Sequence, residues 1–341
     1  MTTDVDLLVV GGGPVGLAAA IEARMRGLSV AVIEPREPPI DKACGEGLMP
    51  GAVVALERLG VVVDGHPIRG IGYRSARAHV DHRFVRGEGL GVRRTLLQSA
   101  LVARATSLGA RFAVAKVTGL EQDAAGVVAA GIRSRYLIGA DGLHSTVRSL
   151  LGVERSPVSN RRYGLRQHFR VPPWSDLVEV HWTSTVEAYV TPVDADTVGV
   201  ALLGPRKMDY AASLVAIPAL AARLESAQAV SSLRGAGPFR QRTRRRRVGR
   251  VLLAGDSSGY VDAITGEGIR VGLAQAEAAV ACIAADDVAA YEHAWTQRTR
   301  DFRVLTAGLV ALAGSPLRSA IVPLAAALPG TFGGIVERLA R

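Results

Sequence analysis

The segment from residue 5 to residue 34 constrains the fold more than any other part of the chain. Residues 5–10, VDLLVV, form an apolar run of strand length, and the alanine-rich stretch 14–28 has the composition of a helix that stops at Gly27. A second apolar run, SVAVIE, follows at 29–34. Two strands joined through a helix lie parallel in one sheet, and helices must cover such a sheet. We therefore expect an α/β domain with a parallel sheet.

A glycine-rich turn joins the first strand to the helix. Gly11, Gly13 and Gly16 fit the pattern GxGxxG, and the acid Glu34 closes the second strand. The first glycine permits a tight turn, the second lets the backbone approach a pyrophosphate, and the third lets helix and strand pack closely. A carboxylate at the end of the second strand can bind a ribose hydroxyl. The pattern predicts an adenine dinucleotide site; it does not separate FAD from NAD, and the alternative is an accidental glycine-rich turn.

The rest of the chain alternates between two kinds of pattern. A helix is expected over 94–109, a strand over 135–140 that ends at Asp141, and another strand over 248–254 that ends at Asp256. Between them, residues 163–203 contain short alternating segments broken by prolines and aspartates, which is typical of an antiparallel sheet. The chain is expected to leave the nucleotide domain, build a second sheet, and return near residue 248.

The predicted fold class is α/β, with a parallel-sheet, Rossmann-like nucleotide-binding domain, an inserted antiparallel-sheet substrate domain and a C-terminal helical segment. The predicted nucleotide-binding domain is discontinuous and comprises residues 1–72, 91–155 and 245–300. The predicted substrate domain comprises residues 73–90 and 156–244, and residues 301–341 form a C-terminal helical cap.

Composition narrows the class of protein. The two cysteines, Cys44 and Cys282, are too few for a disulfide framework or a zinc site, so a reducing, cytoplasmic compartment is expected and no metal site is predicted. The net charge of +10 will attract acidic partners. Arginine fills six of the eight positions from 240 to 247, and this run is either a solvated loop or a surface for an anionic substrate or membrane. Nucleic acid is disfavoured, because aromatic residues make up only 5% of the chain.

The two ends of the sequence carry no targeting or spanning pattern that we recognise. The N-terminal residues lack a basic region and a cleavage site. The longest apolar tract, 304–328, is interrupted by Gly-Ser-Pro at 314–316 and by Arg318, so no spanning helix is expected. Short apolar helices from this tract would either cap the substrate pocket or lie on a membrane, where the arginines could contact anionic lipid.

Two later stretches carry a family resemblance. YLIGADGLHSTVR at 136–148 contains a strand followed by Asp-Gly, and VGRVLLAGDSSGYVDAITGEGIR at 248–270 contains a strand followed by Gly-Asp. With GxGxxG, the order and spacing of these motifs resemble the flavoprotein superfamily of p-hydroxybenzoate hydroxylase and geranylgeranyl reductase, over roughly residues 4–300. The resemblance implies FAD as the cofactor.

The resemblance also implies roles for individual residues. Asp256 would accept a hydrogen bond from a ribityl hydroxyl, and Gly266 and Gly268 would let the backbone lie against the flat ring. The backbone N–H groups of Gly268 and Ile269, at the start of a helix over about 267–285, would stabilise negative charge on the reduced ring. Arg94, with Arg93 as its rival, would bind the pyrophosphate. The full predicted set for FAD is Gly11, Gly13, Val15, Gly16, Glu34, Arg36, Arg94, Val117 (adenine, through its backbone), Asp141, Gly142, Gly255, Asp256, Gly266, Gly268 and Ile269. For Asp141, an ordinary strand-to-turn aspartate is the alternative.

Two departures from the hydroxylase pattern favour the reductase branch. GDSSG stands where hydroxylases commonly have GDAAH, and CGEGL at 44–48 is similar to a reductase segment near the flavin. Cys44 and Glu46 are therefore the candidate catalytic residues, Cys44 as a group at the flavin face and Glu46 as an acid near the ring; plain packing is the alternative for the cysteine. His168 and His181 either face substrate or are ordinary satisfied histidines.

The predicted function is that of an FAD-dependent oxidoreductase that acts on an apolar small molecule such as an isoprenoid, polyketide or aromatic. Flavin hydride transfer at a carbon–carbon bond is favoured, and a flavin monooxygenase that uses NAD(P)H and O2 is the alternative. Because a second GxGxxG after a strand is missing from the sequence, NAD(P)H would bind only transiently, or an external donor would reduce the flavin. A membrane-associated flavin-binding protein without turnover and an NAD-only dehydrogenase are the remaining hypotheses.

Overall fold

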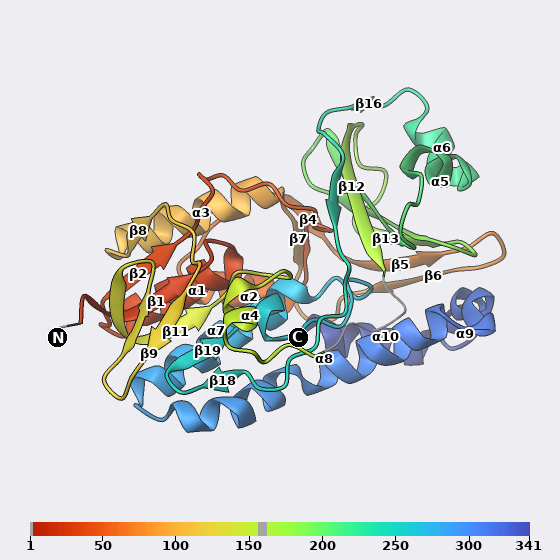
Figure 1. Ribbon diagram of the computed structural model, residues 1–341. Coiled ribbons are helices and arrows are strands. Elements are labelled where there is room, and N and C mark those ends of the chain that lie inside the picture. Colours follow the sequence, from red (N-terminus) through yellow and green to blue (C-terminus); the bar gives the residue numbers. More distant parts are fainter. Residues whose placement is uncertain (1–2, 156–161) are drawn as a thin grey trace.

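Two large sheets and a set of C-terminal helices make up the molecule. The computed structural model describes residues 3–155 and 162–341. Figure 1 shows the first sheet with its helices at the left, the second sheet at the upper right, and the long C-terminal helix α8 running beneath both.

The first sheet is the predicted parallel sheet. Its strand order is β18-β19-β11-β1-β2-β8, and the pairs β19–β11, β11–β1, β1–β2 and β2–β8 are parallel. The hairpin β9–β10 continues from β11 in antiparallel register, and β18 pairs antiparallel with β19. The strands are β1 (Val5–Val10), β2 (Val30–Ile33), β8 (Arg111–Ala113), β9 (Leu120–Gln122), β10 (Val127–Ala129), β11 (Ile132–Gly139), β18 (Arg247–Val248) and β19 (Val251–Leu253).

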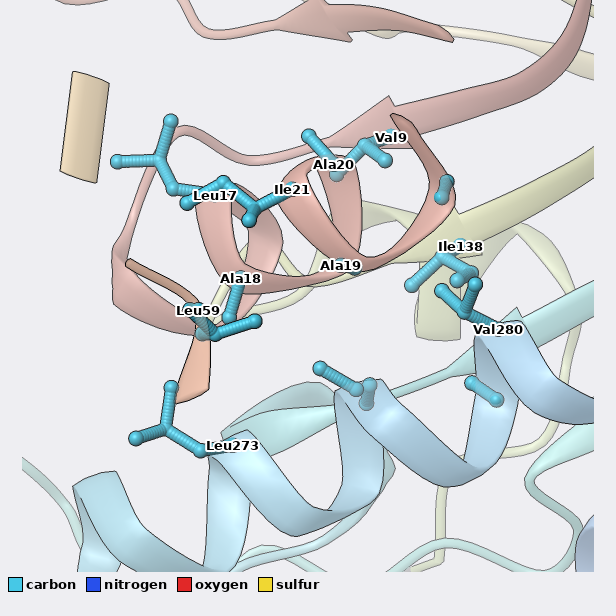
Figure 2. Close-up of a cluster of buried hydrophobic side chains, with 14 of the residues drawn as sticks. Val9, Leu17, Ala18, Ala19, Ala20, Ile21, Leu59, Ile138, Leu273 and Val280 are labelled. Atoms are coloured by element: carbon cyan, nitrogen blue, oxygen red, sulfur yellow. The ribbon is translucent and has the colours of Figure 1, made fainter. Parts of the chain in front are cut away.

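Helices bury one face of this sheet. The covering helices are α1 (Pro14–Met25), α2 (Pro50–Arg58), α3 (Arg94–Ser107) and α7 (Gly268–Ala284). Figure 2 shows the alanines of α1, Ala18 to Ala20, between β1 and α7, where small side chains let the two helices approach closely. The opposite face packs against α4 (Thr146–Leu150), the β9–β10 hairpin and Val117.

The start of α1 depends on the glycine turn. Gly13 is the extended N-cap and Pro14 occupies the first helical position, where its missing N–H costs nothing. A Cβ on Gly16 would lie 1.9 Å from the carbonyl oxygen of Gly11, which itself has φ +112°. Only glycine permits this approach of helix to strand.

The second sheet is largely antiparallel. Its order is β16-β12-β15-β14-β13-β5-β6 with β17 also on β12, and β13–β5 is its parallel pair. One face packs against α5 (Tyr210–Val215) and α6 (Pro218–Leu224), and the other faces the cavity described below. The strands are β5 (Gly70–Arg74), β6 (His79–Arg83), β12 (Tyr163–Arg170), β13 (Leu177–Trp182), β14 (Glu187–Pro192), β15 (Thr197–Gly204), β16 (Gln228–Ala229) and β17 (Arg234–Ala236).

A small third sheet and the C-terminal helices connect the two halves. The small sheet contains β3 (Gly47–Leu48), β7 (Gly89–Gly91) and β4 (His66–Ile68) in the order β3-β7-β4. The C-terminal elements are α8 (Tyr291–Ala313), α9 (Ile321–Ala327) and α10 (Pro329–Ala340), together with the 3₁₀ turns η1 (Gly255–Ser258), η2 (Val288–Ala290) and η3 (Pro316–Ala320). The start of α8 packs in the core of the first sheet through Trp295, and its end packs under the second sheet through Ala313.

The predicted fold class is confirmed, whereas the domain limits stay a prediction. The limit after residue 72 falls inside β5, which belongs to the second sheet, and the limit after residue 300 falls inside α8. The strand predicted over 248–254 is instead two antiparallel strands, β18 and β19, because the chain turns at Gly249, which has φ +58°, and the second of them ends one residue early. The chain leaves β19 at Leu253, and Asp256 lies in η1 rather than at a strand end, because Gly255 has φ +67° and the hydroxyls of Ser257 and Ser258 donate back to the carbonyls of Ala254 and Gly255.

No single helix among residues 3–155 and 162–341 is long and apolar enough to cross a membrane. By length and composition alone, a bent pair of segments, Val288–Ala313 and Pro316–Ala327, meets the requirement with an angle of 102° between its halves.

Candidate functional site

One large cavity, of about 740 Å³, lies between the two sheets. Its lining begins at the carboxyl ends of the parallel strands, where open α/β sheets bind ligands. It continues along one face of the second sheet and ends at the C-terminal helices. All the predicted cofactor and catalytic residues line it except Gly11, Gly16 and Val117.

The three exceptions have structural positions. Gly11 and Gly16 shape the turn beside the cavity through the close approach described above. Val117 is buried in the apolar cluster on the far face of the parallel sheet. A role for its backbone in holding adenine therefore stays a prediction.

Glu34 stands at the nucleotide end of the cavity. Its Oε2 accepts a hydrogen bond from the backbone N–H of Gly12 at 2.9 Å, and its Oε1 accepts one from Nε of Arg36 at 2.7 Å. Burial tends to raise the pKa of Glu34, but these hydrogen bonds and the charge of Arg36 outweigh it and hold the pKa below its ordinary value. The carboxylate is thus ionised and suited to accept hydrogen bonds from ribose hydroxyls.

Arg94 points toward the glycine turn. A Cβ on Gly13 would lie 3.8 Å from its Nη2, and Arg94 lines the cavity whereas Arg93 does not. The Nε of Arg94 is buried without a hydrogen-bond partner among the residues the structure describes. A buried, unpaired guanidinium N–H beside a helix N-terminus is the donor set that a pyrophosphate requires.

Asp141 uses its carboxylate within its own turn. Its Oδ1 accepts from the hydroxyl of Ser145 at 2.5 Å and its Oδ2 from the backbone N–H of Val147 at 3.0 Å, so the side chain holds the start of α4. Asp141 and Gly142 nevertheless line the cavity.

Arg148 joins the two later motifs. This side chain is buried, and its guanidinium donates to the carbonyl of Leu143 at 2.9 Å and to those of Asp256 and Ser257 at 3.4 and 3.3 Å. It therefore fixes the 255–258 turn against the turn that contains Asp141. Sequence reasoning did not assign it a role, since the two partners in the 255–258 turn lie more than 100 residues away.

The carboxylate of Asp256 is available to a ligand. Nζ of Lys42 lies 3.7 Å from Oδ2 of Asp256, and the side chain of Asp256 is about one-third exposed. Lys42 also lies near Gly142, where a Cβ would be 3.3 Å from its Nζ. Val15 packs against Gly255, which fixes the approach of α1 to this turn. Sequence reasoning did not single out Lys42.

The last glycine turn lies at the N-terminus of α7. Helix α7 begins at Gly268, close to the predicted start, so its first N–H groups have no partner within the helix. Gly266 has φ +71°, and a Cβ there would meet no atom within 4 Å, which leaves a bare backbone surface at the cavity wall. Such a surface suits a flat ring.

Glu267, between these glycines, was also missed. It is buried, lines the cavity, and accepts a hydrogen bond from Nε of Arg270 at 2.7 Å. Burial raises its pKa to about 7, against the opposing effect of Arg270. The sequence shows that an acid, Glu267, stands between the two glycines of a candidate cofactor turn. Its burial, which makes it a candidate proton carrier, is evident only in the folded structure.

Glu46 has its carboxylate engaged on both oxygens. Its Oε1 accepts from the backbone N–H of Arg94 at 2.8 Å, and its Oε2 lies 2.5 Å from Nε2 of His168. Nδ1 of His168 lies 3.1 Å from Nη1 of Arg166 and 3.0 Å from the hydroxyl of Ser231. Nε2 of His168 is therefore the ring atom that donates to Glu46, and Glu46 ties the 41–47 segment to the start of α3.

Cys44 lines the cavity, and its sulfur accepts a long contact of 3.4 Å from the backbone N–H of Glu46. His168 and His181 do not line the cavity. His181 instead lies 3.4 Å from Glu179 on the second sheet. His168 is thus held by protein partners, whereas Nε2 of His181 makes no hydrogen bond among the described residues.

The other end of the cavity is an apolar chamber. The second sheet contributes mainly aliphatic and aromatic side chains, and the C-terminal helices close the chamber from the opposite side. Its lining residues include Ile71, Tyr73, Val178, Val180, Tyr189, Ala201, Leu203 and Phe239 from the sheet side, and Leu305, Leu309, Leu312, Ile321 and Phe332 from the helices. No group of three His, Cys, Asp or Glu able to hold a metal ion occurs in the described part of the chain.

This geometry matches what comparison with known proteins shows. Residues 4–286 match the FAD binding domain family, so the chain belongs to this family of flavoproteins and its cofactor is FAD. Two solved structures share the fold: a flavin-dependent brominase (TM-score 0.82, 18% identity, 98% of this chain and 94% of that one) and p-nitrophenol 4-monooxygenase from Pseudomonas putida (TM-score 0.82, 19% identity, 100% and 97%).

Curated relatives match over parts of their length. A rifampicin monooxygenase from Streptomyces venezuelae is 34% identical over 165 residues, which are 43% of this chain and 34% of the relative. A menaquinone reductase from Mycolicibacterium smegmatis is 35% identical over 168 residues, 45% of this chain and 41% of the relative. The chain thus spans well under half the length of either relative.

The residues present fit FAD. The unpaired Nε of Arg94 beside the glycine turn suits the pyrophosphate, and the bare backbone at Gly266 suits the isoalloxazine ring. The roles of the individual residues remain proposals.

Proposed function

We propose that the chain is an FAD-dependent oxidoreductase that acts on an apolar small molecule and transfers hydride at a carbon–carbon bond. The observation that carries the proposal is the continuity of the cavity: the glycine turns that fit FAD and the apolar chamber line one space. An apolar chamber of this kind selects for a lipophilic substrate and excludes water from the reacting atoms.

When bound, FAD supplies the hydride chemistry. The chain's own contribution is to bind, orient and stabilise charge. The N–H groups of Gly268 and Ile269, at the start of α7, favour negative charge at the cavity wall, and they need not reorganise to do so. Asp256 would accept a hydrogen bond from the ribityl chain of the cofactor, and Arg94 would donate to its pyrophosphate.

Reduction of a double bond needs a proton as well as a hydride, and Glu267 is the group we assign to hold it. With a pKa of about 7, its carboxyl carries an exchangeable proton in part of the molecules at neutral pH. Arg270 fixes the carboxyl by its hydrogen bond at 2.7 Å. In this assignment Glu46 positions the 41–47 segment, whereas from the sequence we expected it to act as an acid. Cys44 packs at the cavity wall, whereas from the sequence we expected it at the flavin face.

A flavin monooxygenase is the second candidate, because the names of several relatives support it. Besides the rifampicin monooxygenase, a 12-dehydrotetracycline 5-monooxygenase/anhydrotetracycline 6-monooxygenase from Streptomyces rimosus is 31% identical over 169 residues. Aromatic and polyketide substrates of that kind would also suit the chamber. NAD(P)H, bound transiently, would serve as the electron donor in this case.

Anaerobic reoxidation separates the candidates. The FAD-loaded protein is reduced with dithionite without O2 and mixed in turn with menaquinone, as a prenylated probe, and rifampicin, as a polyketide probe. With stoichiometric dithionite, hydride transfer predicts reoxidation of the flavin without O2 and a menaquinone product that has gained two hydrogen atoms at a carbon–carbon double bond of its prenyl chain and not at the quinone carbonyls. A monooxygenase predicts no product until O2 is admitted, and then a product with one added oxygen atom. Reoxidation by O2 alone, with both probes unchanged, would favour a flavin-binding protein without turnover on these substrates.

A further inference from the structure

The segment 304–336 is almost free of charge. Arg318 is its one charged residue, and this side chain turns inward: it is 13% exposed and its Nη1 lies 2.7 Å from Oε1 of the buried Glu187 on β14. The end of α8, the whole of α9 and most of α10 therefore present no charge to the outside. An uncharged surface of three helical segments is unusual for a protein that faces only water.

Large apolar side chains on this segment are exposed. We define the apolar rim as Val304, Leu317, Leu324, Leu328 and Ile335, whose exposed fractions are 64%, 61%, 53%, 56% and 43%. Four of the five, all except Leu317, also line the cavity. The apolar chamber thus opens through the apolar rim.

Charged residues flank the uncharged segment on both sides, and arginines outnumber acids: Arg298, Arg300 and Arg303 against Asp301 before it, and Arg338 and Arg341 against Glu337 after it. Arg298 and Arg300 precede it on α8, and both are exposed and make no ion pair among the residues described. Arg338 and Arg341 follow it at the end of α10, where Arg338 pairs with Asp301. The whole chain carries a net charge of +10. A cationic border around an apolar surface complements a membrane with anionic headgroups.

We propose that the apolar rim inserts into the surface of an anionic membrane and that the chamber takes its substrate from the lipid phase. Insertion of the apolar rim does not depend on the proposed function. Uptake of the substrate from the lipid phase rests on it. The lipid surface is the single occupant to which we commit.

The packing of the helices indicates insertion into one leaflet rather than crossing. The bent pair Val288–Ala313 and Pro316–Ala327 is anchored on the protein, because Trp295 is buried in the core of the first sheet and Ile321 and Val322 are buried under the second. A helix pair held along the protein in this way lies on a bilayer. A two-fold contact between two copies through the apolar rim would bring the flanking arginines of both copies together, which is unfavourable.

The test is vesicle flotation of the FAD-loaded full chain. Vesicles of phosphatidylcholine alone are compared with vesicles that also contain phosphatidylglycerol, at low and high salt. We expect binding that increases with phosphatidylglycerol. The double variant Leu324→Glu/Leu328→Glu should bind at least about tenfold more weakly, since it places two charges where apolar side chains enter the membrane. The milder Leu328→Ser should give an intermediate loss.

Val215→Glu is the matched control. Val215 is 72% exposed on α5, which packs on the opposite face of the second sheet, so this variant should bind like the parent protein. Bound FAD per chain is measured for every variant, to show that each is folded.

Three results would overturn the docking proposal: no binding of the parent protein to anionic vesicles at low salt, equal binding by the Leu324→Glu/Leu328→Glu variant, or a dimer in solution that this variant dissociates. Flotation does not depend on turnover. A protein that binds vesicles but reduces no substrate would contradict only the proposed function, and a protein that turns over dispersed substrate but does not bind vesicles would contradict only the docking.

Discussion

Replacing Glu267 by glutamine tests the most unusual ionisable group of the cavity. The folded chain holds the Glu267 proton with a pKa of about 7, against the ordinary value of 4.5. As the pH rises through this window, the unfolded chain loses the proton first, so the free energy of unfolding falls between pH 4.5 and about 7 and stays lower above that range. The difference in pKa corresponds to about 3 kcal/mol.

The Glu267→Gln substitution removes this pH-dependent loss of stability. The amide is neutral at every pH and its oxygen can still accept from Nε of Arg270. Relative to the parent protein, we expect the variant to have nearly equal stability at pH 4.5 and to be more stable by about 3 kcal/mol at pH 8.

The assay is urea unfolding at a series of pH values with saturating FAD, and the FAD dissociation constant is measured at each pH to correct for linkage. The control is Glu57→Gln, the same substitution at an exposed glutamate of α2 that does not line the cavity. A stability difference for Glu267→Gln that does not change with pH would refute our view that burial holds this proton.

Three further substitutions test the cofactor end and its support. Arg94→Ala should weaken FAD binding by about tenfold or more, because it removes a charged donor from the pyrophosphate position; isothermal titration measures this, and unchanged affinity would exclude the role. Gly16→Ala places a Cβ 1.9 Å from the carbonyl oxygen of Gly11, so we expect a lower melting temperature and loss of FAD, and a protein that melts and binds as before would be inconsistent with the turn described. His168→Leu removes the donor to the buried Glu46 carboxylate and should lower the free energy of unfolding by about 2 kcal/mol, measured with urea; no change would mean that Glu46 is not held as we describe.

Local patterns in the sequence were sufficient to predict the parallel sheet and its glycine turns. The strand that ends at Val10 and the turn with Gly11 and Gly16 depend on short-range apolar runs and on backbone sterics, which neighbouring residues determine. The same local signals predicted the start of α7 near Gly268 to within one residue. These features agree with the structure because few distant contacts can override them.

The contacts that complete the site could not be predicted in the same way. Lys42 meets Asp256 across more than 200 residues, and the burial that sets the pKa of Glu267 arises only after the chain has folded. The strand before Asp256 ends early because the hydroxyls of Ser257 and Ser258 donate hydrogen bonds to the carbonyls of Ala254 and Gly255. These local hydrogen bonds compete with strand pairing, and the apolar pattern of the sequence does not reveal them. Likewise, the sequence did not show that the carboxylate of Asp141 accepts hydrogen bonds within its own turn, and a role for Asp141 beside the pyrophosphate stays a prediction.

The visible spectrum of the purified protein, before and after addition of menaquinone as an apolar ligand, tests the central claim most directly. If the FAD site and the apolar chamber are one space, the protein carries one FAD per chain, and the ligand shifts the flavin absorption bands because it lies against the ring. A folded preparation that takes up no FAD, or flavin bands that do not respond to menaquinone, rifampicin or any other apolar ligand, would contradict this account.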